Sequence, residues 1–208
     1  MLTLVIGNKN LSSWSLRPWL VVRHLGLPFA EVKLMLDTPE FKPAALRYSP
    51  SGRVPVLVDD GFAVWDSLAI AEYLNEKSGG RGWPANDQAR AHARAISAEM
   101  HSGFAALRQT WPMDITARRE VPLTPAAAGD VARVDGLWQE CRARHGERGP
   151  WLFGDYSIAD AMYAPVVLRF NTYQANVSPV ARAYIEQTLA DPHLRAWMQQ
   201  AREEVGAA

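Results

Sequence analysis

Three serines and an arginine lie close together near the start of the chain, in the segment Ser12-Ser13-Trp14-Ser15-Leu16-Arg17. The apolar run before this segment predicts a short strand, and the pattern after it predicts a helix. The serine hydroxyls would then lie beside the unpaired N–H groups and the positive dipole end of that helix. Such donors can hold an anion, or lower the pKa of a bound thiol by favouring its charged form. Ser12 or Ser13 could equally serve only as the helix N-cap.

A second group of candidate binding residues follows further along, in Gly52-Arg53-Val54-Pro55 and Asp66-Ser67. A cis Val54–Pro55 bond would turn the Val54 peptide group towards a peptide-like ligand, although the statistics of X–Pro bonds favour a trans bond. Asp66 and Ser67 open a predicted helix and offer a carboxylate, a hydroxyl and backbone N–H groups. Together they could hold an amino acid by its ammonium and carboxylate, or could simply cap the helix.

The elements that carry these motifs alternate between strands and helices. The order β-α-β-α-β-β-α predicts a small sheet with helices on both faces. Strands are expected over 2–7, 29–35, 56–58 and 62–65, the last two joined by the hairpin turn Asp59-Asp60-Gly61, and helices over 15–25, 39–47 and 67–77.

A glycine-rich segment with a proline, Ser78–Pro84, is typical of a domain edge. We therefore predict a first domain over 1–78, a linker over 79–86 and a second, all-helical domain over 87–208. One long helix over 87–108, ending near Trp111, is expected to open the second domain. Further helices are expected over 124–145, from Ser157 onward, over 179–189 and over 192–204.

Composition narrows the function classes. Lys plus Arg and Asp plus Glu both number 22 in 208 residues, so no net charge attracts nucleic acid or a membrane surface. No apolar run is long enough to span a bilayer, and no signal peptide is evident. The lone Cys141 excludes an internal disulfide and, with the other features, predicts a cytoplasmic protein. The five histidines show no ligand spacing, so we expect no metal site.

In their order and spacing, these motifs resemble the glutathione transferase family over essentially the whole chain. The matching features are Ser12-Ser13-x-Ser15-x-Arg17, Gly52-Arg53-Val54-Pro55, Asp66-Ser67 and, in the helical part, Gly154–Asp160. The resemblance implies an α/β thioredoxin-like N-terminal domain followed by an all-α C-terminal domain. It also implies a homodimeric detoxification enzyme that uses glutathione as a co-substrate and attacks a small electrophile.

The resemblance also implies roles for individual residues. The first tyrosine is Tyr48, too late to be the sulfur donor that many members use, so the chain resembles a serine-type member. Ser12 is the candidate donor to the glutathione sulfur, with Ser13 as the alternative. Val54, with Arg53 beside it, would hold the cysteinyl part of glutathione by its backbone. Asp66 and Ser67 would hold the γ-glutamyl end.

Among classes, the serine motif most resembles the zeta class, some of whose members isomerise maleylacetoacetate. Arg169 is similar to the arginine with which those members hold a substrate carboxylate. Trp14 stands where zeta members carry cysteine, and Asp66 replaces their usual Gln or Glu. The candidate second-substrate residues are Trp14, Arg108, Trp111 and Arg169. Trp111 also fits a helix core position, and Arg108 and Arg169 also fit helix surface positions.

The main prediction is therefore a glutathione transferase. Two alternatives stay open, a glutathione-dependent isomerase of the maleylacetoacetate isomerase type and a glutathione-binding module without catalytic activity.

Overall fold

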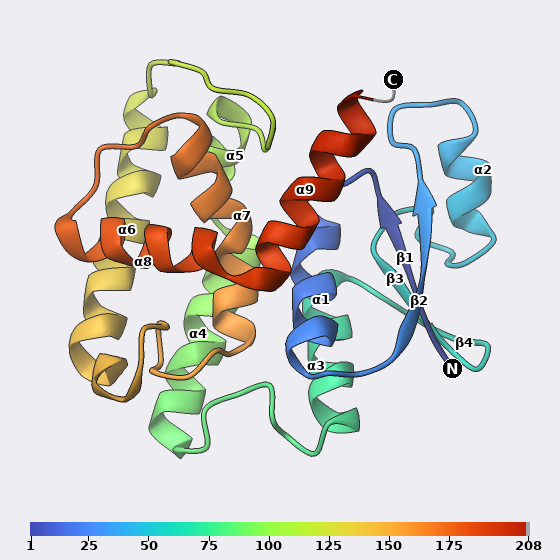
Figure 1. Ribbon diagram of the computed structural model, residues 1–208, viewed down its shortest axis with the longest axis horizontal. Helices are drawn as coiled ribbons and strands as arrows, with labels where there is room; N and C mark the ends of the chain where they lie inside the picture. The colour runs from blue at the N-terminus through green and yellow to red at the C-terminus, as the bar shows by residue number, and fades with distance from the viewer. Residues whose placement is uncertain (207–208) are drawn as a thin grey trace.

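The first 77 residues build a four-stranded sheet with helices on both faces (Figure 1) in the computed structural model, which describes residues 1–206. The strand order is β2-β1-β3-β4, with β1 parallel to β2 and antiparallel to β3. Helix α2 covers one face, and α1 and α3 cover the other. The elements are β1 (Leu2–Gly7), α1 (Ser13–His24), β2 (Phe29–Leu34), α2 (Phe41–Leu46), β3 (Val56–Asp59), β4 (Phe62–Trp65) and α3 (Ser67–Lys77). This is the predicted thioredoxin-like arrangement.

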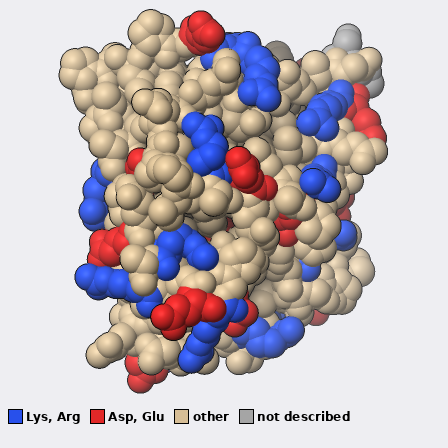
Figure 2. Space-filling view, turned by 60° about the vertical axis from the view of Figure 1, so that its left-hand side comes forward, with Lys and Arg blue, Asp and Glu red and all other residues tan. Residues whose placement is uncertain are grey.

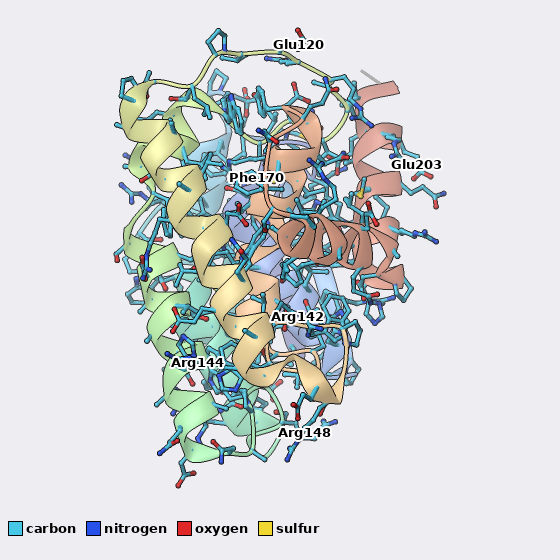
Figure 3. The ribbon with its side chains drawn as sticks, turned by 90° about the vertical axis from the view of Figure 1, so that its left-hand side faces the viewer. Glu120, Arg142, Arg144, Arg148, Phe170 and Glu203 are labelled. Carbon is cyan, nitrogen blue, oxygen red and sulfur yellow. The ribbon has the colours of Figure 1, made fainter. Side chains whose placement is uncertain are left out.

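The rest of the described chain is helical. A long loop that carries Glu120 crosses one end of the helical part between α5 and α6 (Figure 3). The helices are α4 (Asp87–Ser102), α5 (Ala105–Thr110), α6 (Pro125–His145), the short 3₁₀ helix η1 (Gly146–Arg148), α7 (Ile158–Thr172), α8 (Pro179–Ala190) and α9 (Pro192–Gly206).

The expectation of one unbroken helix over 87–108 is wrong. Gly103 is extended, with φ −99° and ψ −167°, and Phe104 takes a left-handed conformation with φ 58°. Glycine is among the poorest helix formers, which favours a break at Gly103. A new helix starts after Phe104, and its Leu107 N–H donates to Asp130 Oδ2 at 2.9 Å. Across the break, the Arg108 guanidinium donates to the Met100 carbonyl near the end of α4.

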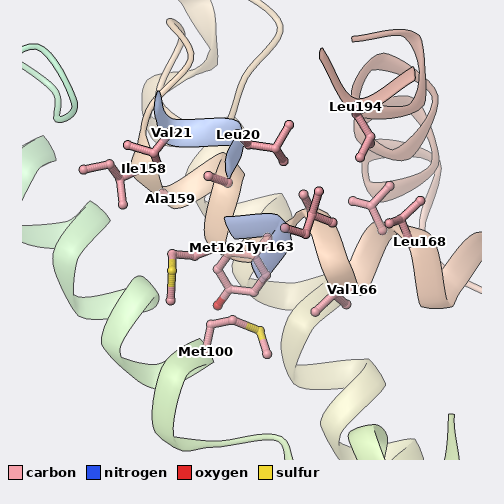
Figure 4. Packing of buried hydrophobic residues seen from close by; sticks show 14 of the residues in the cluster. Leu20, Val21, Met100, Ile158, Ala159, Met162, Tyr163, Val166, Leu168 and Leu194 are labelled. Carbon is pink, nitrogen blue, oxygen red and sulfur yellow. The ribbon is translucent and has the colours of Figure 1, made fainter. Parts of the chain in front are cut away.

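Helix α1 makes the main contact between the two parts of the molecule, against α7. Its Val21 lies beside Ile158 of α7 (Figure 4). The apolar core is continuous from the sheet through α1 into the helical part. Almost every residue of α7 is buried, which explains why that helix is apolar on all sides in the sequence.

The start of α7 is fixed by a capping box formed by Ser157 and Asp160. Asp160 is fully buried and accepts hydrogen bonds from the Ser157 N–H at 2.9 Å, the Leu152 N–H at 3.1 Å and the Tyr184 hydroxyl at 3.1 Å. Burial nevertheless raises the pKa of the Asp160 carboxyl to about 6, against the opposing effect of these donors.

Helix α9 returns to the sheet and fixes the segment after β1. The buried Lys9 ammonium donates to Glu31 on β2 at 2.5 Å and to Gln200 on α9 at 2.6 Å. The Trp197 indole N–H donates to the Lys9 carbonyl at 3.0 Å. Acidic and basic side chains are interspersed over the face shown in Figure 2. No helix within residues 1–206 has both the length and the apolar character needed to cross a bilayer.

Candidate active site

Ser12 and Ser15 lie at the beginning of α1 and are bonded to each other. The Ser12 hydroxyl donates to Ser15 Oγ at 2.7 Å, and the Gly7 N–H at the end of β1 donates to the same oxygen at 3.1 Å. Ser12 holds the N-cap position, yet its side chain makes no capping hydrogen bond. Its hydroxyl is therefore not used to cap the helix. Ser13, the first residue of α1, is only half-buried.

Asn10 holds the segment before Ser12 against the loop between α5 and α6. Its side-chain oxygen accepts from the Ile115 N–H at 2.8 Å and the Thr116 N–H at 3.1 Å. Its side-chain nitrogen donates to Asp114 Oδ1 at 3.0 Å. One buried amide thus ties the approach to the serines to the helical part of the molecule.

A pocket of about 600 Å³ opens beside the start of α1. It brings together the candidates Trp14, Arg53, Val54, Asp66 and Ser67, which the sequence spreads over more than 50 positions. Its lining is Trp14, Ser51, Arg53, Val54, Pro55, Trp65, Asp66, Ser67 and His101. The size and the mixture of aromatic and polar walls suit a small peptide-sized ligand.

The wall before β3 presents peptide groups to this pocket. The Val54–Pro55 bond is cis, so the expectation of a trans bond is wrong. Val54 precedes β3 and lies outside its ladder, which leaves its peptide group open to pairing with a ligand. Arg53 is exposed at the same wall.

Asp66 has two separate partners at the start of α3. Its Oδ1 accepts from the N–H groups of Leu68 at 2.9 Å and Ala69 at 3.2 Å, so it does cap the helix. Its Oδ2 lies 3.1 Å from His101 Nε2 and faces the pocket side. The backbone of Asp66 has a positive φ of 78° with ψ 132°, which lies outside the left-handed helical region and is strained for a residue with a side chain. Ser67 is buried, and its hydroxyl has no hydrogen-bond partner within the described residues.

Trp14 stands between the pocket and two guanidinium groups. The Cζ atoms of Arg17 and Arg108 lie 4.2 Å and 4.8 Å from the centre of its ring. His101 packs edge-on against the same indole, with ring centres 5.3 Å apart. Burial, with the charges of Arg108 and Arg169, lowers the pKa of Arg17 well below its ordinary value. Within the described residues, Nε and Nη1 of Arg17 have no hydrogen-bond acceptor.

Five of the candidate residues are not part of the pocket lining: Ser12, Ser13, Arg108, Trp111 and Arg169. Arg169 is 5% exposed and donates to the carbonyls of Trp111 at 2.9 Å and Pro165 at 3.1 Å. Burial and the charge of Arg108 lower its pKa to about 10, so it stays a cation at neutral pH. The Trp111 ring is buried and stacks on Tyr173 with centres 5.2 Å apart.

Sequence reasoning missed His101 and Trp65 as lining residues. His101 comes from α4, and no spacing in the sequence relates it to Asp66. Cys141 is fully buried, and burial raises the pKa of its thiol to about 12, so it is no nucleophile. Within the part of the chain that the structure describes, no group of three or more His, Cys, Asp or Glu side chains is placed to hold a metal ion.

Comparisons with known proteins match both parts of the chain to one family. Residues 11–77 match the family model for the glutathione S-transferase N-terminal domain, and residues 87–200 match that for the C-terminal domain. A probable maleylacetoacetate isomerase from Caenorhabditis elegans is 30% identical over 186 residues, covering 88% of this chain and 86% of that protein. A dichloromethane dehalogenase from Methylorubrum extorquens is 45% identical over 61 residues, which cover 28% of this chain and 21% of the dehalogenase.

A solved structure gives the same result for the fold. A glutathione transferase homologue from Burkholderia, crystallised with bound glutathione, superposes with a TM-score of 0.74 at 27% identity. The match covers 97% of this chain and 98% of the other. The two-part fold predicted from the sequence is therefore confirmed over nearly the whole length.

Proposed function

The chain belongs to the glutathione S-transferase family, and on that premise we propose how its pocket binds glutathione and activates the thiol. The observation that carries the proposal is the juxtaposition of three kinds of group in one pocket. A peptide group outside a ladder at Val54, a carboxylate at Asp66 and an unpartnered hydroxyl at Ser67 line a space beside the start of α1. These are complementary to the peptide, ammonium and carboxylate of a γ-glutamyl tripeptide.

Each part of glutathione then has a place. The γ-glutamyl ammonium pairs with Asp66 Oδ2, and its carboxylate accepts from the Ser67 hydroxyl. The cysteinyl peptide pairs with the Val54 backbone. Arg53, the cation on the same wall, suits the glycyl carboxylate. The sulfur is directed to the N-terminus of α1.

Activation of the thiol follows from the charges at that N-terminus. The thiol proton leaves to solvent, and the Ser12 hydroxyl donates to the resulting thiolate beside the positive end of the α1 dipole. Both interactions lower the thiol pKa towards neutrality. The thiolate attacks the electrophile, a sulfur–carbon bond forms, and the leaving group departs with its electron pair. The electrophile binds on the Trp14 side of the pocket, where Arg108 lies against the ring.

Isomerase activity on an acidic substrate is the second candidate, favoured by the three arginines near Trp14. Burial lowers the pKa of all three guanidinium groups, and the charge of Arg108 lowers those of Arg17 and Arg169 further. None of the three has a carboxylate hydrogen-bonded to it within the described residues. Such a cluster suits an anionic group on the substrate. A thiolate that adds to a double bond, allows rotation and leaves again would isomerise it. Turnover of matched acidic and neutral electrophiles distinguishes the two candidates.

We also propose that the protein is a cytoplasmic homodimer. Phe62 and Trp65 on β4 are 63% and 46% exposed and border a shallow apolar groove with α3. An exposed apolar groove of this kind is typical of an association surface. Trp65 also lines the glutathione pocket, so a second copy seated on the groove would lie next to that site.

The proposal is tested by titrating glutathione into the protein in a calorimeter and by following the ultraviolet absorbance of the bound thiolate against pH. We expect binding with a thiol pKa well below that of free glutathione. Ser12→Ala should leave the affinity nearly unchanged and raise the bound thiol pKa by about 1–2 pH units, the value of a hydrogen bond to a charged group. Ser13→Ala is the matched control. An effect confined to Ser13→Ala would move the donor role to Ser13, and binding without a thiolate signal would favour a binding module.

A further inference from the structure

Ser15 carries a buried hydroxyl group next to the proposed sulfur donor, Ser12. It is 0% exposed, lies in the first turn of α1 and, like Ser12, is not part of the pocket lining. Its oxygen accepts the Ser12 hydroxyl at 2.7 Å and the Gly7 N–H at 3.1 Å. The oxygen therefore already accepts two hydrogen bonds, and its own hydrogen is still available to be donated.

The end of β1 fits closely against this pair of hydroxyls. A Cβ atom added at Gly7 would lie 2.9 Å from Ser12 Oγ and 3.0 Å from Leu36 Cδ1, so any larger residue would displace the Ser12 hydroxyl. The Gly7 N–H meanwhile anchors Ser15. Gly7 thus leaves room for the Ser12 hydroxyl and anchors the Ser15 hydroxyl.

We propose that Ser15 is a positioning residue that supports Ser12 in thiol activation, an inference that rests on the proposed function. In the resting protein, Ser12 donates to Ser15. When Ser12 turns its hydrogen to the sulfur of glutathione, Ser15 turns its own hydrogen to Ser12 Oγ. The chain then runs from the Gly7 N–H through Ser15 and Ser12 to the thiolate, with every donor directed at the negative charge.

The step is two hydroxyl rotations, and no proton leaves either serine. Ser12 exchanges the bond that it donates to Ser15 for a bond that it accepts from Ser15, so its oxygen never loses its buried partner. An unpartnered buried hydroxyl would cost free energy, which this exchange avoids. Hydrogen bonds in such a chain polarise one another and strengthen the last one, here the bond to sulfur.

The test is a double-mutant cycle on the thiol pKa of bound glutathione, with Ser12→Ala, Ser15→Ala and the double variant. In such a chain, the hydrogen bond from Ser15 strengthens the bond from Ser12 to the thiolate by about 10–30%. Its loss in Ser15→Ala should therefore raise the thiol pKa by up to about half a pH unit. Below the pKa, this is up to about a threefold loss of thiolate and of kcat, with the glutathione affinity unchanged. In the Ser12→Ala background, Ser15→Ala should have no further effect, because Ser15 acts through Ser12.

Ser97→Ala is the matched control, since Ser97 is also a fully buried helical serine, and its hydroxyl has no partner within the described residues. It should leave the thiol pKa unchanged. No rise in Ser15→Ala, or an equal rise with and without Ser12, would overturn the role of Ser15. If Ser12→Ala itself leaves the thiol pKa unchanged, the proposed function fails at that residue, and the two failures are thereby distinguished. Should Ser15→Ala not fold, Ser15→Cys retains the side chain with a weaker donor and should shift the pKa in the same direction.

Discussion

Replacing Arg17 by methionine should leave the free protein about as stable or slightly more stable, and impair its use of acidic substrates. The Arg17 side chain is 1% exposed, and Nε and Nη1 have no hydrogen-bond acceptor within the described residues. Two further cations, Arg108 and Arg169, act on it. Methionine has a similar length and a flexible apolar side chain, so it can fill the same space without the charge.

The magnitude follows from two opposing effects. Replacing buried charged groups by apolar residues of similar volume often stabilises by about 1–4 kcal/mol. Against this, Arg17 packs at 4.2 Å on the Trp14 ring, and a desolvated contact of this kind contributes about 2 kcal/mol. We therefore expect the free energy of unfolding to change by between a loss of about 1 kcal/mol and a gain of about 2 kcal/mol. For a chain of this size, the upper end of this range corresponds to a rise in Tm of about 4–8 °C.

Urea unfolding and thermal unfolding without glutathione measure the effect, and Arg169→Met is the matched control. Arg169 is equally buried but donates to two carbonyls, so its loss should destabilise by about 1–3 kcal/mol. With acidic electrophiles, Arg17→Met should raise KM relative to neutral ones. A destabilisation of Arg17→Met by more than about 1 kcal/mol, or similar effects of the two variants, would refute the argument from the unpartnered guanidinium.

Three further predictions concern other parts of the molecule. Asp66→Asn keeps the oxygen that caps α3 but removes the charge, so calorimetry should show glutathione affinity at least about tenfold weaker with little change in Tm. Phe62→Asp should shift the protein from dimer to monomer in analytical ultracentrifugation, and an unchanged sedimentation coefficient would argue against the β4 groove as the interface. The pKa of Asp160 is about 6 in the folded protein, so between about pH 4 and 6 its carboxyl keeps a proton that the unfolded chain has released. The free energy of unfolding should therefore fall by up to about 3 kcal/mol as the pH rises from about 4 to 6. Urea titrations of Asp160→Asn should lack this pH dependence.

Local signals in the sequence predicted most of the elements, because the helix or strand preference of each of these segments agrees with the structure that it adopts in the folded protein. The strand Leu2–Gly7 and the helix Ser67–Lys77 match the structure at both ends, the helix because Asp66 caps it and Lys77 lies in its last turn. The helix after Asp87 was predicted too long, because helical periodicity continues through Gly103 while the backbone does not. There the packing of α5 on α6, with Asp130 as cap, overrides the local pattern.

The candidate site was predictable only where its residues are close in sequence. Ser12, Val54 and Asp66 each follow or precede a predicted strand or helix, and sheet topology brings such ends together. His101 could not be found, since its contact with Asp66 depends on how α4 packs beside α3. The burial of Arg169 could not be found either, because an arginine on a helix is usually exposed, and only the nearly complete enclosure of α7 makes it an interior residue.

Helix α1 packs against the sheet on one side and against α7 on the other. A hinge motion between the halves would pull apart the surface on which the serines stand, at the cost of an exposed apolar interface. We therefore expect no gating by separation of the halves. Substrates would enter and products leave past side chains and loops at the rim, with the segment that carries the serines held in place.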